Sequence, residues 1–175
     1  AEHKPLEKSA FMIRLFLILI LVVCFLILSI PVLFAEWVIG KISPHARDIS
    51  SLRIIQFVFK LVMRITGSKV TVLGEENIPR DTAVLYIANH RSLFDTVLTY
   101  SRCPGLTGYV SKDSMAKVPL LSIWMKRLYC LFLNRTDIRE GMKTILAGIE
   151  QMKNGISMCI FPEGTRNKEP DAPML

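Results

Sequence analysis

The first hydrophobic feature of the chain is a run of twenty uncharged residues, Leu15 to Phe34. As a helix this run rises about 30 Å, the thickness of the hydrocarbon core of a bilayer. A secretory signal peptide has a shorter apolar core and a small-residue cleavage site, so that alternative is rejected. We predict a membrane helix, kinked near Pro31, with Trp37 at headgroup level. Cations lie on both sides of the run, so a spanning and a re-entrant form stay open.

A second helical pattern covers residues 49–66. Arg53, Gln56, Lys60 and Arg64 recur at helical spacing as one polar stripe, and apolar residues fill most of the remaining circumference. This pattern predicts an amphipathic helix lying in the headgroup layer of anionic lipid. The alternative is a helix packed in a protein core with a solvated stripe.

From residue 69 onward, short apolar runs rich in strand formers alternate with helical patterns. This alternation predicts an α/β fold, which we expect to be a mixed sheet flanked by helices. We divide the chain into a membrane-anchoring helical segment, residues 1–68, and an α/β domain, residues 69–175. The predicted strands are Lys69–Leu73, Ala83–Ala88, Thr107–Val110, Leu131–Arg135 and Ile156–Phe161.

One helix of the α/β domain has a particularly regular pattern. Its apolar residues recur at i, i+4, i+7, i+8, i+11 and i+14, so we expect this face to pack on the sheet. The residues are Ile138, Met142, Ile145, Leu146, Ile149 and Met152.

Charge and composition narrow the possible partners. Half of the residues are apolar (51%), and the net charge of +7 divides as about +4 over residues 1–68 and +3 over the remainder, which favours anionic surfaces. The cations are scattered, without aromatic residues between them or a helix-turn-helix signal, so nucleic acid is rejected as a partner. The four cysteines have no Cys-x-x-Cys spacing for metal or redox work, which predicts a reduced, cytosolic domain.

Polar chemistry begins where the predicted strand Ala83–Ala88 stops, at Asn89 and His90. Ser92 then reads as a helix cap, and Asp95 lies one turn further on. From there the Asp95 carboxylate can hold one ring nitrogen of His90, leaving the other as a base near neutral pH. The alternative is that Asp95 only completes a capping box and that His90 is only a polar residue at a strand end.

A second polar cluster follows the predicted strand Ile156–Phe161 and contains Phe161-Pro-Glu-Gly-Thr-Arg166. Open α/β sheets bind ligands at the edge where such strand ends meet. Together, Asn89-His90-x-x-x-x-Asp95 and Phe161–Arg166 resemble the hallmarks of the glycerolipid acyltransferase family. The resemblance extends from about Val70 onward, and it is strongest to bacterial-type 1-acyl-glycerol-3-phosphate acyltransferases.

The resemblance implies roles for the residues of these blocks. His90 and Asp95 would be catalytic, and Asn89 would support them. Acceptor binding would fall to Lys112, Arg135, Glu163, Gly164, Thr165 and Arg166.

Two residues depart from the family's third block, which contains Arg135: Asn134 stands where Asp is usual, and Tyr129 lies near a customary Gly. Arg135 at a strand end can grip phosphate with two hydrogen bonds, or pair with a neighbour such as Asp137. A later aliphatic block of the family is missing, so we expect the domain to be incomplete at its carboxyl end.

The implied reaction moves an acyl group from acyl-CoA or acyl-carrier protein to the free sn-2 hydroxyl of 1-acyl-glycerol-3-phosphate, giving phosphatidic acid. No bound cofactor or metal is expected. Other acceptors within the family, such as glycerol 3-phosphate or another lysolipid, stay open. The partners would be a phospholipid membrane, the lysophospholipid acceptor and the acyl donor, with the catalytic domain on the cytoplasmic side of the cell membrane.

Two alternatives come from other classes of protein. One is a membrane-anchored lipid-binding module without turnover. The other is a metal hydrolase with His90, Asp95 and Glu163 as ligands, but His3 and His45 both lie in the amino-terminal segment, so no second histidine is close in sequence.

Overall fold

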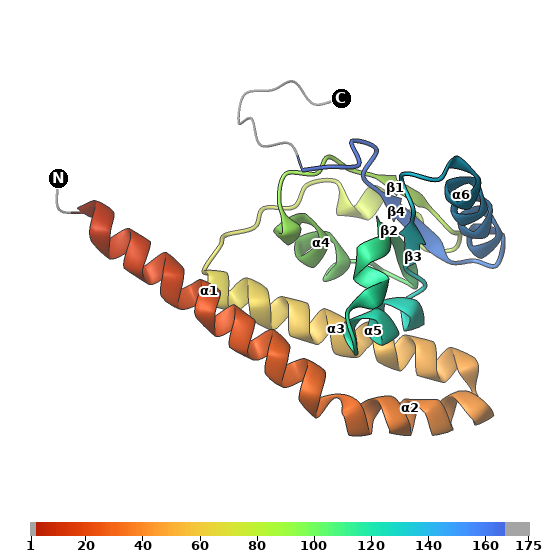
Figure 1. Ribbon diagram of the computed structural model, residues 1–175, viewed down its shortest axis with the longest axis horizontal. Coiled ribbons are helices and arrows are strands. Elements are labelled where there is room, and N and C mark those ends of the chain that lie inside the picture. Colours follow the sequence, from red (N-terminus) through yellow and green to blue (C-terminus); the bar gives the residue numbers. More distant parts are fainter. Residues whose placement is uncertain (1–2, 167–175) are drawn as a thin grey trace.

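The computed structural model describes residues 3–166, with side chains described from residue 9. A layer of three long helices lies under an α/β unit whose four-stranded sheet carries one further helix on its far side (Figure 1). Residues 167–175 of the predicted α/β domain lie outside the described residues. In chain order the elements are α1 (His3–Leu28), α2 (Ile30–Ile42), α3 (Pro44–Thr66), the short 3-10 helix η1 (Glu75–Asn77), β1 (Leu85–Ile87), α4 (Leu93–Tyr100), β2 (Thr107–Lys112), η2 (Asp113–Lys117), α5 (Leu121–Arg127), β3 (Leu131–Leu133), α6 (Ile138–Lys153) and β4 (Ser157–Ile160).

The sheet has the order β1-β4-β2-β3, and its three strand pairs are all parallel. The α/β fold with flanking helices is therefore confirmed, but the sheet is parallel where we expected it to be mixed. A helix lies in every connection between successive strands, as parallel pairing requires. The carboxyl ends of all four strands consequently meet at one edge of the sheet.

One predicted strand is wrong. Residues 68–73 form no strand, and Val70, Val72 and Leu73 are 42%, 40% and 90% exposed. The local pattern suits a strand, but no described strand lies beside this segment to accept its hydrogen bonds. The segment instead leads from the end of α3 to η1.

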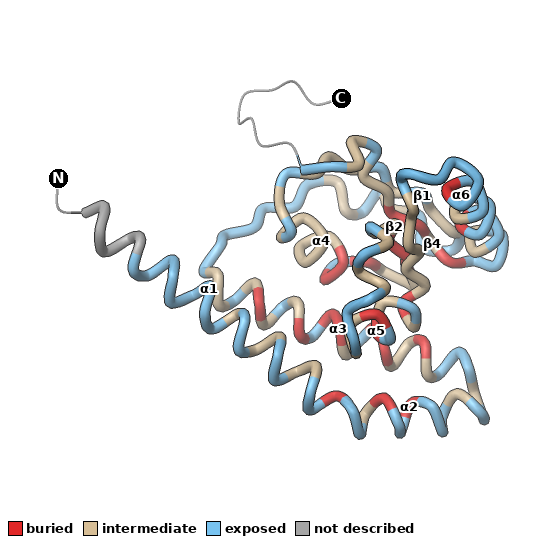
Figure 2. The backbone as a smooth tube through the Cα atoms, in the orientation of Figure 1, coloured by how far each residue is buried: buried red, intermediate tan, exposed pale blue. Residues whose placement is uncertain are grey.

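The predicted membrane helix is divided in two at Ser29 (Figure 1). Pro31 stands in the first turn of α2, where the missing N–H costs no hydrogen bond, so the proline begins a new helix instead of kinking one. The stretch long and apolar enough to cross a membrane is Ser9–Leu28, and none of it is buried (Figure 2). The apolar character that we predicted is present, but it belongs to α1, and α2 turns away.

Helix α3 lies at the centre of the molecule, between α1 and α2 on one side and α4 and α5 on the other. Ser43 caps its amino end, Pro44 occupies its first position, and Gly67 ends it with a φ of 68°. Its residues Leu52, Ile55, Val58 and Val62 are buried. The structure thus matches the alternative of a core-packed helix. Of the predicted polar stripe, Arg53, Lys60 and Arg64 are exposed, but Gln56 is buried.

Buried polar contacts join the helical layer to the α/β unit. Glu36 of α2 is 2% exposed, and its Oε2 accepts hydrogen bonds from Arg127 of α5 at 2.8 Å and from Ser51 at 2.6 Å. At the break between α1 and α2, the Ser29 hydroxyl accepts a hydrogen bond from the Trp124 indole at 2.9 Å. Because removing one partner would leave the other buried and unpaired, these contacts fix how the domain sits on its helices.

The main core fills the space between the helical layer and one face of the sheet. Its buried members come from α2, α3, α4, α5 and the strands that face them: Leu33, Leu52, Ile55, Tyr100, Cys103, Tyr109, Trp124, Leu128 and Cys159.

The other face of the sheet carries α6, and here the predicted packing is wrong. The helix meets the sheet through Gly141 and Gly148, where an added Cβ would lie 3.4 Å from Asn134 O and from Leu131 Cδ1. The two glycines allow α6 to approach the sheet closely. The face that packs on the sheet is therefore the glycine face, and not the apolar face that we predicted. That apolar face is exposed instead (Figure 2), with Ile138 88%, Met142 53%, Ile145 55%, Leu146 57% and Ile149 47% accessible.

Candidate active site

Strand β1 and helix α4 hold the first polar cluster. After β1 ends, the chain turns at His90 and enters α4, whose first turn contains Asp95. His90 Nδ1 lies 3.0 Å from Asp95 Oδ2, and the same oxygen accepts the backbone N–H groups of Arg91 at 2.7 Å and Ser92 at 2.8 Å. The carboxylate is therefore held by the backbone, and it holds the imidazole in turn.

The capping interpretation of Asp95 is also correct. Ser92 and Asp95 form a capping box at the start of α4, with the Ser92 hydroxyl accepting a hydrogen bond from Phe94 N at 3.2 Å. The two interpretations do not exclude each other. The same carboxylate oxygen accepts the backbone N–H of the cap residue Ser92 and faces His90. The cap is what gives the carboxylate its fixed position.

Phe161 fixes the His90 ring from its other side. The two rings stack with centroids 4.4 Å apart and an interplanar angle of 23°. With Nδ1 directed at Asp95, a proton on Nδ1 leaves Nε2 as the acceptor nitrogen. The side chains of His90 and Asp95 are 17% and 26% exposed, so the pair is shielded without being closed off from a ligand.

The second polar cluster directly contacts the first. Asn89 Nδ2 donates to Glu163 Oε1 at 3.1 Å, which joins two blocks 74 residues apart. Glu163 Oε2 is buried and has no hydrogen-bond partner among residues 3–166. Gly164 adopts a φ of 66°, a left-handed conformation that closes the turn with a bond from its N–H to Phe161 O at 3.0 Å.

The third block reaches the same place. A Cβ on Gly164 would lie 4.0 Å from the Arg135 guanidinium, so this arginine, just after β3, lies beside the Glu163-Gly164 turn. Asp137 caps α6 by accepting from Arg139 N at 2.9 Å and Glu140 N at 3.2 Å, and it forms no ion pair with Arg135. The predicted alternative of an Arg135–Asp137 pair is therefore wrong.

The remaining predicted site residues follow the carboxyl ends of β2 and β4. Lys112 is the last residue of β2, and Thr165 and Arg166 come after β4; all three are exposed. Sheet topology places them at the same edge as His90, but within the described part of the chain none of them forms a hydrogen bond or ion pair with it.

The two departures from the family pattern are accommodated locally. Asn134 Oδ1 accepts the N–H groups of Thr136 at 2.9 Å and Asp137 at 3.2 Å, the turn-forming role that an aspartate can also fill. Tyr129 has a φ of 59°, a region that favours glycine, and its hydroxyl donates to Asp48 of α3. That bond to the helical layer offsets part of the backbone strain.

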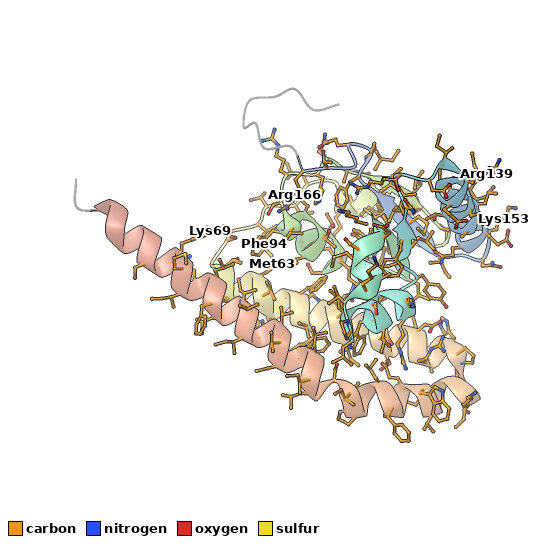
Figure 3. The ribbon with its side chains drawn as sticks, viewed as in Figure 1. Met63, Lys69, Phe94, Arg139, Lys153 and Arg166 are labelled. Atoms are coloured by element: carbon orange, nitrogen blue, oxygen red, sulfur yellow. The ribbon has the colours of Figure 1, made fainter. Side chains whose placement is uncertain are left out.

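A cavity of about 330 Å³ lies beside the dyad. It is lined by Asp95, by the polar residues Ser68, Lys69 and Thr71, and by the apolar residues Met63, Val70, Phe94 and Leu98. Met63, Lys69 and Phe94 lie together where the end of α3 faces α4 (Figure 3). The cavity therefore offers an apolar wall within reach of the His90–Asp95 pair.

The buried cysteines are inert at neutral pH. Burial raises the pKa of Cys130 to about 11 and that of Cys159 to about 12, so both are protonated thiols. Residues 3–166 contain no group of three His, Cys, Asp or Glu side chains arranged to hold a metal ion. Among the residues that the structure describes, the imidazole of His90 is thus the group best placed for proton transfer.

Comparison with known proteins places this geometry in a family. A profile described as Acyltransferase matches residues 69–174, more than half of the chain. The chain belongs to the acyltransferase family. The family resemblance predicted from the two hallmark blocks is confirmed.

Several curated members of the acyltransferase family resemble the chain. It is 33% identical to the 1-acyl-sn-glycerol-3-phosphate acyltransferase of Borreliella burgdorferi, over 64% of this chain and 45% of that protein. It is also 33% identical to the enzyme of that name from Saccharomyces cerevisiae, over 78% of this chain and 44% of that protein. The chain therefore spans less than half the length of these relatives.

A solved acyltransferase has the same fold. The crystal structure of the 1-acyl-sn-glycerophosphate (LPA) acyltransferase PlsC from Thermotoga maritima matches with a TM-score of 0.78 and 25% identity. The match covers 94% of this chain, so it includes the three amino-terminal helices, and 64% of the Thermotoga chain.

Two contributions to this acyltransferase site were missed from the sequence. The stacking of Phe161 on His90 has a signal in hindsight, since Phe161 opens the second block, but the sequence does not show which ring it meets. Met63 and Lys69 were assigned to an amphipathic helix in the headgroup layer and to a strand, and their place beside Asp95 depends on how α3 docks on α4.

Proposed function

We propose that the protein transfers an acyl group from an acyl thioester to the free sn-2 hydroxyl of 1-acyl-glycerol-3-phosphate, giving phosphatidic acid. The observation that carries this proposal is the 3.0 Å contact between His90 Nδ1 and Asp95 Oδ2 at the edge where the second polar cluster meets the first. The choice of acceptor rests on the relatives, which are 1-acyl-sn-glycerol-3-phosphate acyltransferases.

His90 acts as the base. Nε2 takes the proton of the sn-2 hydroxyl, and the hydroxyl oxygen bonds to the thioester carbonyl carbon. The carbon–sulfur bond then breaks, the electron pair leaves on sulfur, and the thiolate takes the proton back from the imidazolium. Asp95 stabilises the charged ring through Nδ1. No acyl-enzyme is required, and the protonated thiols of Cys130 and Cys159 are not nucleophiles.

The site positions the acceptor hydroxyl by binding the acceptor's phosphate. Arg135 lies beside the Gly164 turn, and Lys112 and Arg166 follow neighbouring strands of the same edge. A guanidinium can bind phosphate with two parallel hydrogen bonds, so this binding energy holds the hydroxyl near His90. Thr165 adds a hydroxyl to the same loop.

The two carboxylate oxygens of Glu163 have different roles in this scheme, and Asn89 takes part in one of them. Glu163 Oε1 is occupied by Asn89 and braces the two loops together, whereas Oε2 is free to accept a hydrogen bond from the acceptor. A buried carboxylate oxygen without a partner is costly, and a ligand hydroxyl would satisfy it.

Two features of the chain suit the lipid chain and the membrane. The apolar wall of Met63, Phe94 and Leu98 beside Asp95 suits an acyl chain. The exposed stretch Ser9–Leu28 of α1 would anchor the protein in a phospholipid membrane, with the α/β domain on the cytoplasmic side. The acyl donor is acyl-CoA or acyl-carrier protein, and no bound cofactor is needed.

The test is thiol release by the full-length protein in neutral-lipid micelles. Acyl-CoA is supplied with 1-acyl-glycerol-3-phosphate, glycerol 3-phosphate, a phosphate-free monoacylglycerol or no acceptor. The proposal predicts release that depends on the acceptor and is fastest with 1-acyl-glycerol-3-phosphate. If thiol release were fastest with glycerol 3-phosphate, that compound would be the acceptor instead. Thiol release that no acceptor stimulates would refute acyl transfer.

A further inference from the structure

A second basic cavity lies at the opposite edge of the sheet from His90. It has a volume of about 430 Å³ and is lined by the α4–β2 connection, the exposed side of α3 and the loop before β1. The α4–β2 connection leads into the amino end of β2, whereas the catalytic blocks follow the carboxyl ends of the strands. Helix α4, eight residues and about 12 Å long, runs from the Asp95 end of the catalytic site to the connection that lines this cavity.

Four cations meet in this cavity. Arg53, Lys60, Arg80 and Arg102 line it together with a single carboxylate, Glu75, so the cavity carries three net positive charges (four cations minus one anion). Glu75 is paired with Arg102. Lys60 and Arg80 form no ion pair with the residues that the structure describes. Like charges in a concave site repel one another, and a bound anion would relieve that repulsion.

Gln56, which is 3% exposed, stabilises the wall of the cavity. Gln56 Nε2 donates to the carbonyls of Cys103 at 2.8 Å and Tyr100 at 3.3 Å, which fixes the α4–β2 connection on α3. Gln56 Oε1 accepts from Arg53 Nη1 at 2.8 Å and so orients that guanidinium. One cation of the cavity is thus positioned in advance by a buried side chain.

The surroundings indicate a lipid as the source of the anion. Phe57 is 67% exposed and lies on the same face of α3 as Arg53 and Lys60, at spacings of four and three residues. An exposed aromatic ring between cations suits the boundary between headgroups and acyl chains. The apolar, unburied stretch of α1 belongs to the same helical layer.

We propose that this cavity binds the phosphate headgroup of an anionic membrane lipid that is not the substrate. Arg53, Lys60, Arg80 and Arg102 hold the phosphate, while Phe57 inserts beside the acyl chains. This goes beyond the transfer reaction proposed above, because the site contains no histidine, its one carboxylate is paired with Arg102, and it lies at the other edge of the sheet. Its role is to hold the α/β domain against an anionic bilayer.

In the experiment, two cations of the catalytic edge are neutralised first. Full-length protein carrying Arg135→Gln and Arg166→Gln is reconstituted in nanodiscs of neutral lipid containing a few per cent of a fluorescent phosphatidylglycerol. Energy transfer from protein labelled at Cys24, which is exposed on α1, then reports how much of this lipid is bound next to the protein. On this background, Lys60→Gln with Arg80→Gln is compared with Lys143→Gln plus Lys153→Gln, two cations of α6 that are 71% and 68% exposed.

The cavity variant is expected to weaken lipid binding by about tenfold, and the α6 variant by less than twofold, since each cation near a phosphate contributes to binding. Equal losses in the two variants would overturn the proposal, because binding would then follow net charge alone. Inorganic phosphate at millimolar concentration should not displace the lipid; full displacement would mean that the site takes a soluble anion and would overturn the lipid assignment. Unchanged unfolding midpoints show that both variants are folded.

Discussion

The two edges of the parallel sheet both collect cations, but they differ in what accompanies them. At the carboxyl edge, Arg135 lies beside a histidine that is held by Asp95 on one side and Phe161 on the other. At the amino edge, Arg53 and Lys60 surround a cavity without any proton acceptor other than Glu75, which is paired with Arg102. The amino-edge cavity thus has cations without an imidazole, whereas the carboxyl edge has a cation beside a positioned imidazole.

The difference arises from how strands and helices end. A parallel strand delivers its next side chains to the carboxyl edge, where the amino end of the following helix supplies N–H groups that hold a carboxylate such as Asp95. The amino edge receives the carboxyl ends of helices, whose free carbonyls are here satisfied by Gln56. Only the first arrangement fixes an anionic group against an imidazole.

The largest expected effect is the loss of the base at the carboxyl edge. His90→Ala should lower acyl transfer by about 10³-fold, within the range of general base catalysis, while lipid binding at the amino edge is unchanged. His45→Ala, which changes an exposed histidine of α3, is the matched control and should retain full activity. Substantial turnover in thiol release by the His90 variant would show that the two edges do not differ as described.

The next largest effect concerns the phosphate. Arg135→Gln should raise the KM for 1-acyl-glycerol-3-phosphate by about tenfold to a hundredfold, because a charge-assisted hydrogen bond is lost, and change the KM for a phosphate-free acceptor little. Arg139→Gln, on the exposed surface of α6, is the control (Figure 3). If the KM rose equally for both acceptors, Arg135 would have a structural role.

The smallest effect compares one glycine from each edge. Gly164→Ala forces a Cβ into a left-handed turn with a φ of 66°, so we expect a loss of about 1 kcal/mol and a decrease of roughly 3 °C in the unfolding midpoint. Gly105→Ala, in the wall of the amino-edge cavity, has open space around its Cβ and should leave the midpoint within 1 °C or so. Equal midpoints for the two variants in a thermal scan would remove the strain argument at the Glu163-Gly164 turn.

Much of the carboxyl edge could be predicted from the sequence because its signals are local. The strand before His90 and the cap at Ser92 depend on neighbours within a few residues, and both are present. The meeting of the two blocks was predicted from the general rule that open α/β sheets bind ligands at the edge where strand ends meet, and the Asn89–Glu163 bond shows that the blocks do meet.

The errors arose where a pattern was local but the outcome depended on a distant partner. Residues 69–73 have strand-forming side chains without a neighbouring strand, and α6 turns its glycines to the sheet because close approach there leaves no room for larger residues. At the break between α1 and α2, the Ser29 hydroxyl accepts a hydrogen bond from Trp124, 95 residues away, a contact that the local pattern cannot show. The amino-edge cavity was missed for the same reason, since Arg80 and Arg102 join the α3 stripe only in three dimensions.

The measurement that tests the central claim most directly is a double-mutant cycle on His90 and Asp95. Asp95→Asn keeps an oxygen that can cap α4 but loses the charge facing the imidazole. If Asp95 acts through His90, this change lowers kcat/KM for thiol release by about 10²-fold in the wild type and by less than threefold or so in the His90→Ala background. Equal losses in the two backgrounds would contradict the account, because Asp95 would then act independently of the ring that it faces.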